Sequence, residues 1–156
     1  MKNKILNHLV FYCGNVKKND KVFLIYDIST KKIYYKFKKF LNKKKINFQS
    51  FFTKNSKNHG KNLGKKIGNI MKKTDITFCI TKNSFAHSKE RLISEKKGKR
   101  FLSLVDFNSK KMDFNFILAP FKKYSKKAKK LKNILDKSEK IKIITNNGTY
   151  LTAEIK

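Results

Sequence analysis

The residues best suited to chemistry form one short polar cluster. Ser84, His87, Ser88 and Arg91 lie within a stretch of eight positions that begins shortly after the apolar run 76–80. A helix that begins there presents free backbone N–H groups, which favour anions. In one interpretation Ser88 caps this helix, His87 forms a hydrogen bond or holds a metal ion, and Arg91 binds a carboxylate or phosphate. In the other, a serine caps the helix, Arg91 is a surface residue and His87 fills a loop. The residue types leave both open.

Other catalytic patterns are absent from the sequence. There is no G-x-S-x-G for a serine nucleophile, no H-E-x-x-H for a metal and no G-x-G-x-x-G for a dinucleotide. The three histidines, His8, His59 and His87, are far apart in the chain. Gly64-Lys65 follows a strand, but its spacing does not fit a phosphate loop. We therefore predict no catalytic residue and no metal ligand in this chain.

The elements around the cluster alternate between strands and helices. Residues 76–81 alternate in polarity as a strand does, and 86–97 suit a helix. Residues 101–104 resume an apolar strand. Together they predict a βαβ unit, which places the polar segment 81–88 at the carboxyl end of its first strand. Open α/β sheets bind ligands at that edge.

The remaining segments continue this alternation. Helical spacing of apolar residues predicts helices at 3–13, 33–44, 63–71 and 121–135. Apolar or alternating runs predict strands at 22–26, 46–52, 141–145 and 149–155, with a hairpin turn at Asn147-Gly148. The fold class is therefore α/β, a Rossmann-like three-layer sandwich with a mostly parallel sheet of about five strands and a C-terminal hairpin. Its length predicts a single domain, residues 1–156.

Five glycines have predicted structural roles. Gly14 and Gly98 are placed to cap helices, Gly98 in the left-handed conformation. Gly60, Gly64 and Gly68 fall four positions apart on one helical stripe. This spacing predicts close packing of a helix on the sheet.

The charge of the chain is its most extreme property. Forty lysines and arginines oppose ten acidic residues, a formal net charge of +30. Such a charge suits a polyanion partner. However, only Arg91 and Arg100 are arginines, the residue that nucleic-acid surfaces favour. Lys, Asn, Ile and Phe have AT-rich codons, so biased base composition also explains the lysines. Either way, we expect weak, salt-sensitive, non-specific binding to polyanions.

The cysteines and the hydropathy pattern indicate a cytoplasmic protein. Cys13 and Cys79 are the only cysteines, and Cys79 sits in mid-strand as a small hydrophobe. No apolar run approaches the roughly 18 residues that span a bilayer, so no membrane association is expected. The first fourteen residues lack a signal-peptide cleavage site.

Three motifs together resemble a known family. They are A-H-S-x-x-R at Ala86–Arg91, K-K-G-K-R-F-L-S-L at Lys96–Leu104 and I-T-x-x-G-T-x-L-T at Ile144–Thr152, in this order after a strand near Asp75. This order resembles the amino-terminal domain of the aminopeptidase T-like metallopeptidases. These are also called the thermophilic metalloprotease or leucyl aminopeptidase-like family, with relatives among the dihydroxypyridine dioxygenases. The resemblance runs from about Leu9 to Ile155, and the family often has His-Thr in place of His87-Ser88.

The resemblance implies a site that needs a second domain. In that family a following domain supplies the Glu, His and Asp ligands of the metal centre, whereas this sequence stops at Lys156. We therefore expect no cofactor in this chain, and zinc, cobalt or manganese only in the absent domain. The residues expected to line the cleft toward that domain, or toward a partner in a homodimer, are Ser84, His87, Ser88 and Arg91, with Thr149 in the segment that leads into it.

Two functions from different classes follow. The first is a structural, docking or substrate-shaping domain, inactive alone, of an enzyme that hydrolyses amino-terminal peptide bonds with a metal-activated water. Peptide substrate would bind only with the missing domain. The second is a small basic RNA- or DNA-binding protein, which predicts submicromolar binding at physiological salt. A third, a binder of a small ligand at the strand ends, predicts a metabolite in the purified protein.

Overall fold

Four parallel strands form a sheet in the order β2-β1-β3-β4. They are β1 (Val22–Tyr26), β2 (Phe48–Phe52), β3 (Ile76–Ile80) and β4 (Arg100–Ser103). The central strands β1 and β3 pair with Val22 opposite Ile76, and nearly all their residues are buried. Their wholly or mainly apolar sequences suit strands that are covered on both faces. The predicted βαβ unit is confirmed, because β3 and β4 are parallel neighbours.

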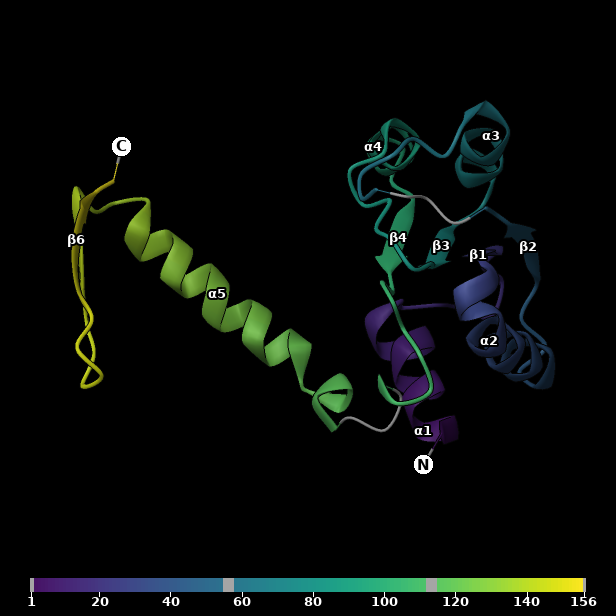
Figure 1. The fold of residues 1–156 in the computed structure, drawn as a ribbon, viewed down its shortest axis with the longest axis horizontal. Coiled ribbons are helices and arrows are strands. Elements are labelled where there is room, and N and C mark those ends of the chain that lie inside the picture. Colours follow the sequence, from purple (N-terminus) through teal and green to yellow (C-terminus); the bar gives the residue numbers. More distant parts are fainter. Residues whose placement is uncertain (1, 55–57, 112–114, 156) are drawn as a thin grey trace. The chain divides into compact units, whose positions relative to one another are not determined.

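The computed structural model describes residues 2–54, 58–111 and 115–155, and divides the chain into two compact units, Met1–Leu118 and Ala119–Lys156 (Figure 1). The first unit contains the parallel sheet. The second contains α5 (Phe121–Leu135), β5 (Lys140–Ile144) and β6 (Tyr150–Glu154). Within the described ranges, no helix is long and apolar enough to cross a bilayer.

Helices cover both faces of the parallel sheet. One face carries α1 (Lys2–Asn7), its π-helical continuation η1 (His8–Cys13) and α2 (Lys31–Lys43), and the other carries α3 (Lys65–Lys73) and α4 (Lys89–Lys96) (Figure 1). Among its described residues the first unit also contains the short 3₁₀ turns η2 (Ile28–Thr30) and η4 (Asn115–Leu118). Successive residues of β1 serve opposite layers, since Leu24 packs in the cluster with α2 and Phe23 in the cluster with α3. The predicted α/β three-layer sandwich is thereby confirmed.

The sheet has four strands, where the sequence predicted about five. The strand expected at 141–145 is β5, which pairs antiparallel with β6 in a separate two-stranded sheet. Lys140 and Lys142 alternate with Ile141 and Ile143 along it. A parallel strand that is covered on both faces cannot place lysines at alternate positions, whereas one strand of a two-faced hairpin can.

The C-terminal hairpin is confirmed, but its turn differs from the predicted one. A two-residue turn at Asn147-Gly148 needs positive φ at both positions. Gly148 has φ of 91°, and Asn147 is not among the described residues with positive φ. The N–H of Thr145 donates to the carbonyl oxygen of Thr149 at 3.0 Å, so the loop holds three residues.

The two glycines predicted at helix ends are confirmed, and the glycine stripe needs correction. Gly14 ends η1, where its N–H donates to the carbonyl oxygen of Leu9 and its φ is −77°, and Gly98 has the expected left-handed φ of 71°. Gly14 has no room for a side chain, because a Cβ at this position would lie 2.7 Å from Cζ of Phe78. Of the glycine stripe, only Gly68 lies within α3, and its Cβ would lie 2.8 Å from Cγ of Glu90 in α4. The close approach is therefore helix to helix, not helix to sheet.

The contact at Gly14 leads to a testable prediction. We expect Gly14→Ala to lower the free energy of unfolding by about 2 kcal/mol, because the new methyl group meets a fully buried ring and the carbonyl oxygen of Val10. Phe78→Leu removes the ring atom in contact, so the double variant should lose less stability than the sum of the two single variants. Urea unfolding measures all three. Additive losses would contradict the contact.

Candidate functional site

The carboxyl ends of β1 and β3 form the point where ligands are expected. The chain leaves β1 toward β2 on one side, and β3 lies on the other side of β1. At such a switch point the loops diverge and usually leave a crevice. The residues that follow these strands are Asp27 after β1 and Thr81 after β3. Both are buried, at 1% exposure each.

The side chain of Asp27 bridges this switch point. Its Oδ2 accepts the backbone N–H of Lys82 at 2.6 Å, and its Oδ1 accepts the backbone N–H of Thr30 at 3.1 Å. The backbone N–H of Asp27 donates to the hydroxyl of Thr30 at 3.3 Å. The hydroxyl of Thr30 in turn donates to the carbonyl oxygen of Ile80, at the end of β3. Asp27 therefore caps the 3₁₀ turn η2 and also ties the end of β1 to the loop after β3.

Ser84 is held within the loop that follows β3. Its hydroxyl accepts the N–H of Ala86 at 3.1 Å, and its own N–H donates to Nδ1 of His59 at 3.1 Å. The carbonyl oxygen of Ser84 accepts the N–H of Gly60 at 2.8 Å. His59 is therefore part of this region, although it is 25 residues away in the sequence. No local pattern could have revealed it, because the pairing depends on how two loops meet.

Ser88 and Arg91 stabilise the start of α4. Ser88 is fully buried, and its hydroxyl accepts the N–H of Arg91 at 3.3 Å, which is the expected helix cap. The guanidinium of Arg91 donates to Oε1 of Glu95 one turn later, at 2.6 Å. Its Nε is buried and lacks a hydrogen-bond partner within the part that the structure describes. His87, the remaining candidate, is exposed. Capping and ion pairing are thus the roles that the geometry gives to Ser88 and Arg91.

The carboxylate of Glu90 accepts hydrogen bonds from backbone N–H groups near this cluster. Glu90, in the first turn of α4, accepts the backbone N–H of Leu63 at 2.8 Å and that of Gly64 at 3.1 Å. These two N–H groups lie just before α3, where an anion would be favoured. Nearby, the side chain of Asn62 accepts the N–H of Lys89 at 3.0 Å. The loops before α3 and α4 are therefore cross-bonded by their own side chains.

The last candidate, Thr149, belongs to the second unit. Its N–H donates to the hydroxyl of Thr145 at 3.2 Å, which closes the hairpin loop. Its predicted place in a segment leading to a further domain stays a prediction. Across the described ranges, the structure shows no group of three His, Cys, Asp or Glu side chains that could hold a metal ion.

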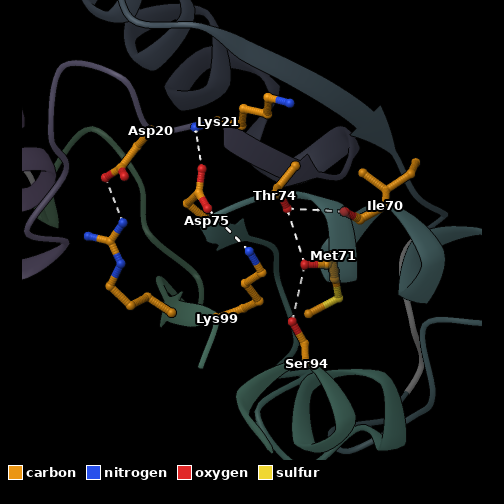
Figure 2. Close-up of polar contacts among 9 residues, drawn as sticks. Asp20, Lys21, Ile70, Met71, Thr74, Asp75, Ser94 and Lys99 are labelled. Carbon is orange, nitrogen blue, oxygen red and sulfur yellow. Dashed lines mark hydrogen bonds and ion pairs between the residues drawn. The ribbon is translucent and has the colours of Figure 1, made fainter. Parts of the chain in front are cut away.

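A second polar network lies at the amino ends of the strands, and it is drawn in Figure 2. Asp75, just before β3, accepts the N–H of Lys21 at 2.8 Å and the ammonium of Lys99 at 3.2 Å (Figure 2). The hydrogen bond from the Lys21 N–H lowers the pKa of Asp75 most, and the ammonium of Lys99 lowers it further. Arg100 donates to Asp20 at 2.6 Å and to the carbonyl oxygen of Gly14 at 2.9 Å. These bonds join β4 to the loop before β1.

An open groove of about 430 Å³ runs beside this network along the edge strand β4. Its apolar lining includes Ile76, Phe101 and Leu102, and Lys99 and Arg100 also line it. Both cations are already paired with Asp75 and Asp20. The buried thiol of Cys79 lies in the neighbouring strand, and burial raises its pKa to about 12. The groove therefore offers apolar surface but no free charged group.

Comparisons with known proteins identify the fold alone. No family model matches the chain, and no curated protein matches it. Among solved structures, 2,5-dihydroxypyridine dioxygenase from Pseudomonas putida KT2440 is similar, with a TM-score of 0.69 and 13% sequence identity. The likeness covers 99% of this chain and 47% of the dioxygenase chain, so the chain spans about half of that protein. At this identity the match supports the Rossmann-like α/β fold.

The bridge at the switch point can be tested by Asp27→Asn. An amide cannot accept at both positions, so its NH₂ group would face the N–H of Lys82 or of Thr30. We expect a loss of about 2 kcal/mol in the free energy of unfolding, because a buried donor loses its partner. Asp106→Asn is the matched control. That side chain is 45% exposed and pairs with lysines, so its loss should stay below about 1 kcal/mol. Equal losses in the two variants would contradict the bridge.

Asp75 predicts a specific pH dependence. Its pKa is lowered in the folded state, so its stabilising effect is present above the unfolded pKa of about 4 and is lost as pH falls through the lower folded value. Asp75→Asn should therefore be less stable than the wild type at pH 7, and the two should converge below pH 4. Urea unfolding at pH 3 to 7 measures this. A gap that stays constant over the range would show that the charge of Asp75 has no part in it.

Proposed function

We propose that this chain is an α/β domain of an aminopeptidase T-like metallopeptidase that is not catalytic by itself. The order of the motifs from Ala86 to Thr152 motivates the family. The observation that carries the non-catalytic role is the bonding at the strand ends. Ser84 and Ser88 accept backbone N–H groups of their own loop and helix, and Asp27 and Glu90 accept those of neighbouring loops. These side chains hold the loops at the strand ends in place. The role proposed for this part of the chain is therefore to support or shape a site that other residues complete.

The chemistry of such an enzyme would come from outside this chain. A second domain would hold a divalent zinc, cobalt or manganese ion, which would supply the activation of water needed to hydrolyse an amino-terminal peptide bond. Of the candidates at the start of α4, His87 is exposed and could face a substrate or a second domain. Cys13 and Cys79 are free thiols, which suits the proposed reducing cytoplasm.

The alternative, a small basic nucleic-acid-binding protein, rests on net charge alone. Specific readout of bases favours the bidentate fork of arginine. Both arginines of this chain are engaged, Arg91 with Glu95 and Arg100 with Asp20 and the carbonyl oxygen of Gly14. Lysine attraction then remains, and it predicts binding that weakens steeply as salt is added. We therefore favour the domain of a metallopeptidase.

The proposal is tested by assaying the purified chain on leucyl-p-nitroanilide with zinc, cobalt or manganese. We expect no release of nitroaniline above the metal-only blank, because the strand-end side chains are bonded to backbone. An aminopeptidase assayed in parallel controls for the substrate. Turnover that EDTA removes would overturn the non-catalytic role.

The family assignment needs a separate observation. The DNA immediately downstream should encode a polypeptide with Glu, His and Asp at ligand spacing. Co-expression of that polypeptide with this chain should give metal-dependent release of nitroaniline, which neither shows alone. A downstream frame without such residues would refute the assignment and leave the fold untouched.

A further inference from the structure

Two groups of hydrogen bonds join the loop before α3 to the loop after β3 and the start of α4. The first group joins residues 59–60 to Ser84. The second joins residues 62–64 to the first turn of α4. The first group depends on an imidazole, whereas the second depends on an amide and a carboxylate. This difference in chemistry gives the two groups different responses to pH.

The imidazole of His59 is a hydrogen-bond acceptor in the first group. Its Nδ1 accepts the backbone N–H of Ser84 at 3.1 Å. A ring nitrogen accepts only while it carries no proton, so His59 is neutral in this arrangement and its proton is on Nε2. In the imidazolium form both ring nitrogens are donors. Protonation of His59 therefore removes this hydrogen bond and leaves two N–H groups facing each other.

The bond to His59 also determines how Ser84 is held. The carbonyl oxygen of Ser84 accepts the N–H of Gly60 at 2.8 Å, so both backbone groups of Ser84 are bonded to residues 59–60. The Ser84 hydroxyl accepts the N–H of Ala86 at 3.1 Å, within the loop that leads to α4. When His59 is protonated, the repulsion between its Nδ1–H and the Ser84 N–H acts against the neighbouring Gly60 bond. This end of the contact should therefore open.

The second group of bonds contains no histidine. Glu90 accepts the N–H of Leu63 at 2.8 Å and that of Gly64 at 3.1 Å, and the side chain of Asn62 accepts the N–H of Lys89 at 3.0 Å. Histidine is the side-chain type that ordinarily changes its charge between pH 5 and 8. The second group should therefore persist where the first is lost, and keep the loop before α3 joined to α4.

One other histidine lies on the segments that meet at this bond. The charged and titratable side chains of segments 58–65 and 81–90, apart from His59, are Lys61, Lys65, Lys82, His87, Lys89 and Glu90. The carboxylate of Glu90 is bonded to backbone N–H groups, and the ammonium of Lys82 pairs with Asp106. His87 is the side chain in this set that belongs to the same titrating type as His59, so an experiment must separate the two histidines.

We propose that His59 is a pH-sensitive latch, which holds the loop of Ser84 as a neutral imidazole and releases it as an imidazolium. The bond is present above the pH at which His59 gains its proton, and it is lost as the pH falls through that value. Ser84 lies shortly before His87 and Ser88, so the latch positions the loop that contains these candidate site residues. The proposal rests on hydrogen bonds within the first unit and holds whichever function that unit serves.

Amide proton exchange of the full chain, measured by NMR, tests the latch. The protection of an amide is its exchange rate in an unstructured chain at the same pH, divided by the measured rate. Between pH 7.5 and 5.5 the protection of the Ser84 and Gly60 amides should fall roughly fivefold, as expected for the loss of one hydrogen bond. The amides of Leu63 and Lys89 should change less than about twofold. Constant protection at Ser84, or an equal fall at all four amides, would overturn the proposal.

Three substitutions assign the response to His59. His59→Asn carries a carbonyl oxygen on the same carbon that bears Nδ1 and does not titrate, so Ser84 should stay protected at both pH values. His59→Ala has no acceptor, so protection should be low at both. His87→Asn should keep the fivefold response. Circular dichroism checks that all three variants keep the fold. A response that survives in His59→Asn or disappears in His87→Asn, or full protection of Ser84 in His59→Ala, would overturn the proposal.

Discussion

The carboxylate of Asp27 is the polar group on which the centre of the sheet depends. It is 1% exposed, yet it accepts N–H groups from Thr30 and from Lys82, which lies 55 residues away. Buried charge is tolerated only where such donors replace water. The two central strands contribute apolar burial, which is not directional. The hydrogen bonds of Asp27 add direction, because they hold the ends of β1 and β3 in one relative position at the point where their loops diverge.

Two other carboxylates act in the same way at other places in the first unit. Asp75 accepts the N–H of Lys21, 54 residues away, and Glu90 accepts that of Leu63, 27 residues away. The chain has ten acidic residues against forty basic ones, so three of its few carboxylates bind backbone N–H groups of distant segments. Each of these bonds joins two segments that lie far apart in the sequence.

The local sequence pattern predicted the helices and strands of the fold, whereas the hydrogen bonds of the site depend on segments that are distant in the sequence. The runs at 22–26 and 76–80, the Ser88 cap and the left-handed Gly98 were recognisable because each depends on neighbours in sequence. Three features depend on which segments meet in space, and sequence reasoning misjudged or missed them: the separation of β5 from the parallel sheet, the Gly14–Phe78 contact and the bond from the Ser84 N–H to His59. The polar cluster lies in the loop after β3 and at the start of α4. Whether its members were free or bonded could be read only from the structure.

The two units of the chain differ in how they satisfy their apolar residues. The first unit buries phenylalanines and branched side chains on both faces of its sheet. The second has the alternation and helical spacing of a packed element, but no buried residue in its helix or strands. The likeness to the dioxygenase covers 99% of this chain, so the elements of the second unit recur in a chain about twice as long. A 15-residue helix and a single hairpin are each marginal in water without a shared core, so the second unit depends for its packing on a surface outside its own helix and strands.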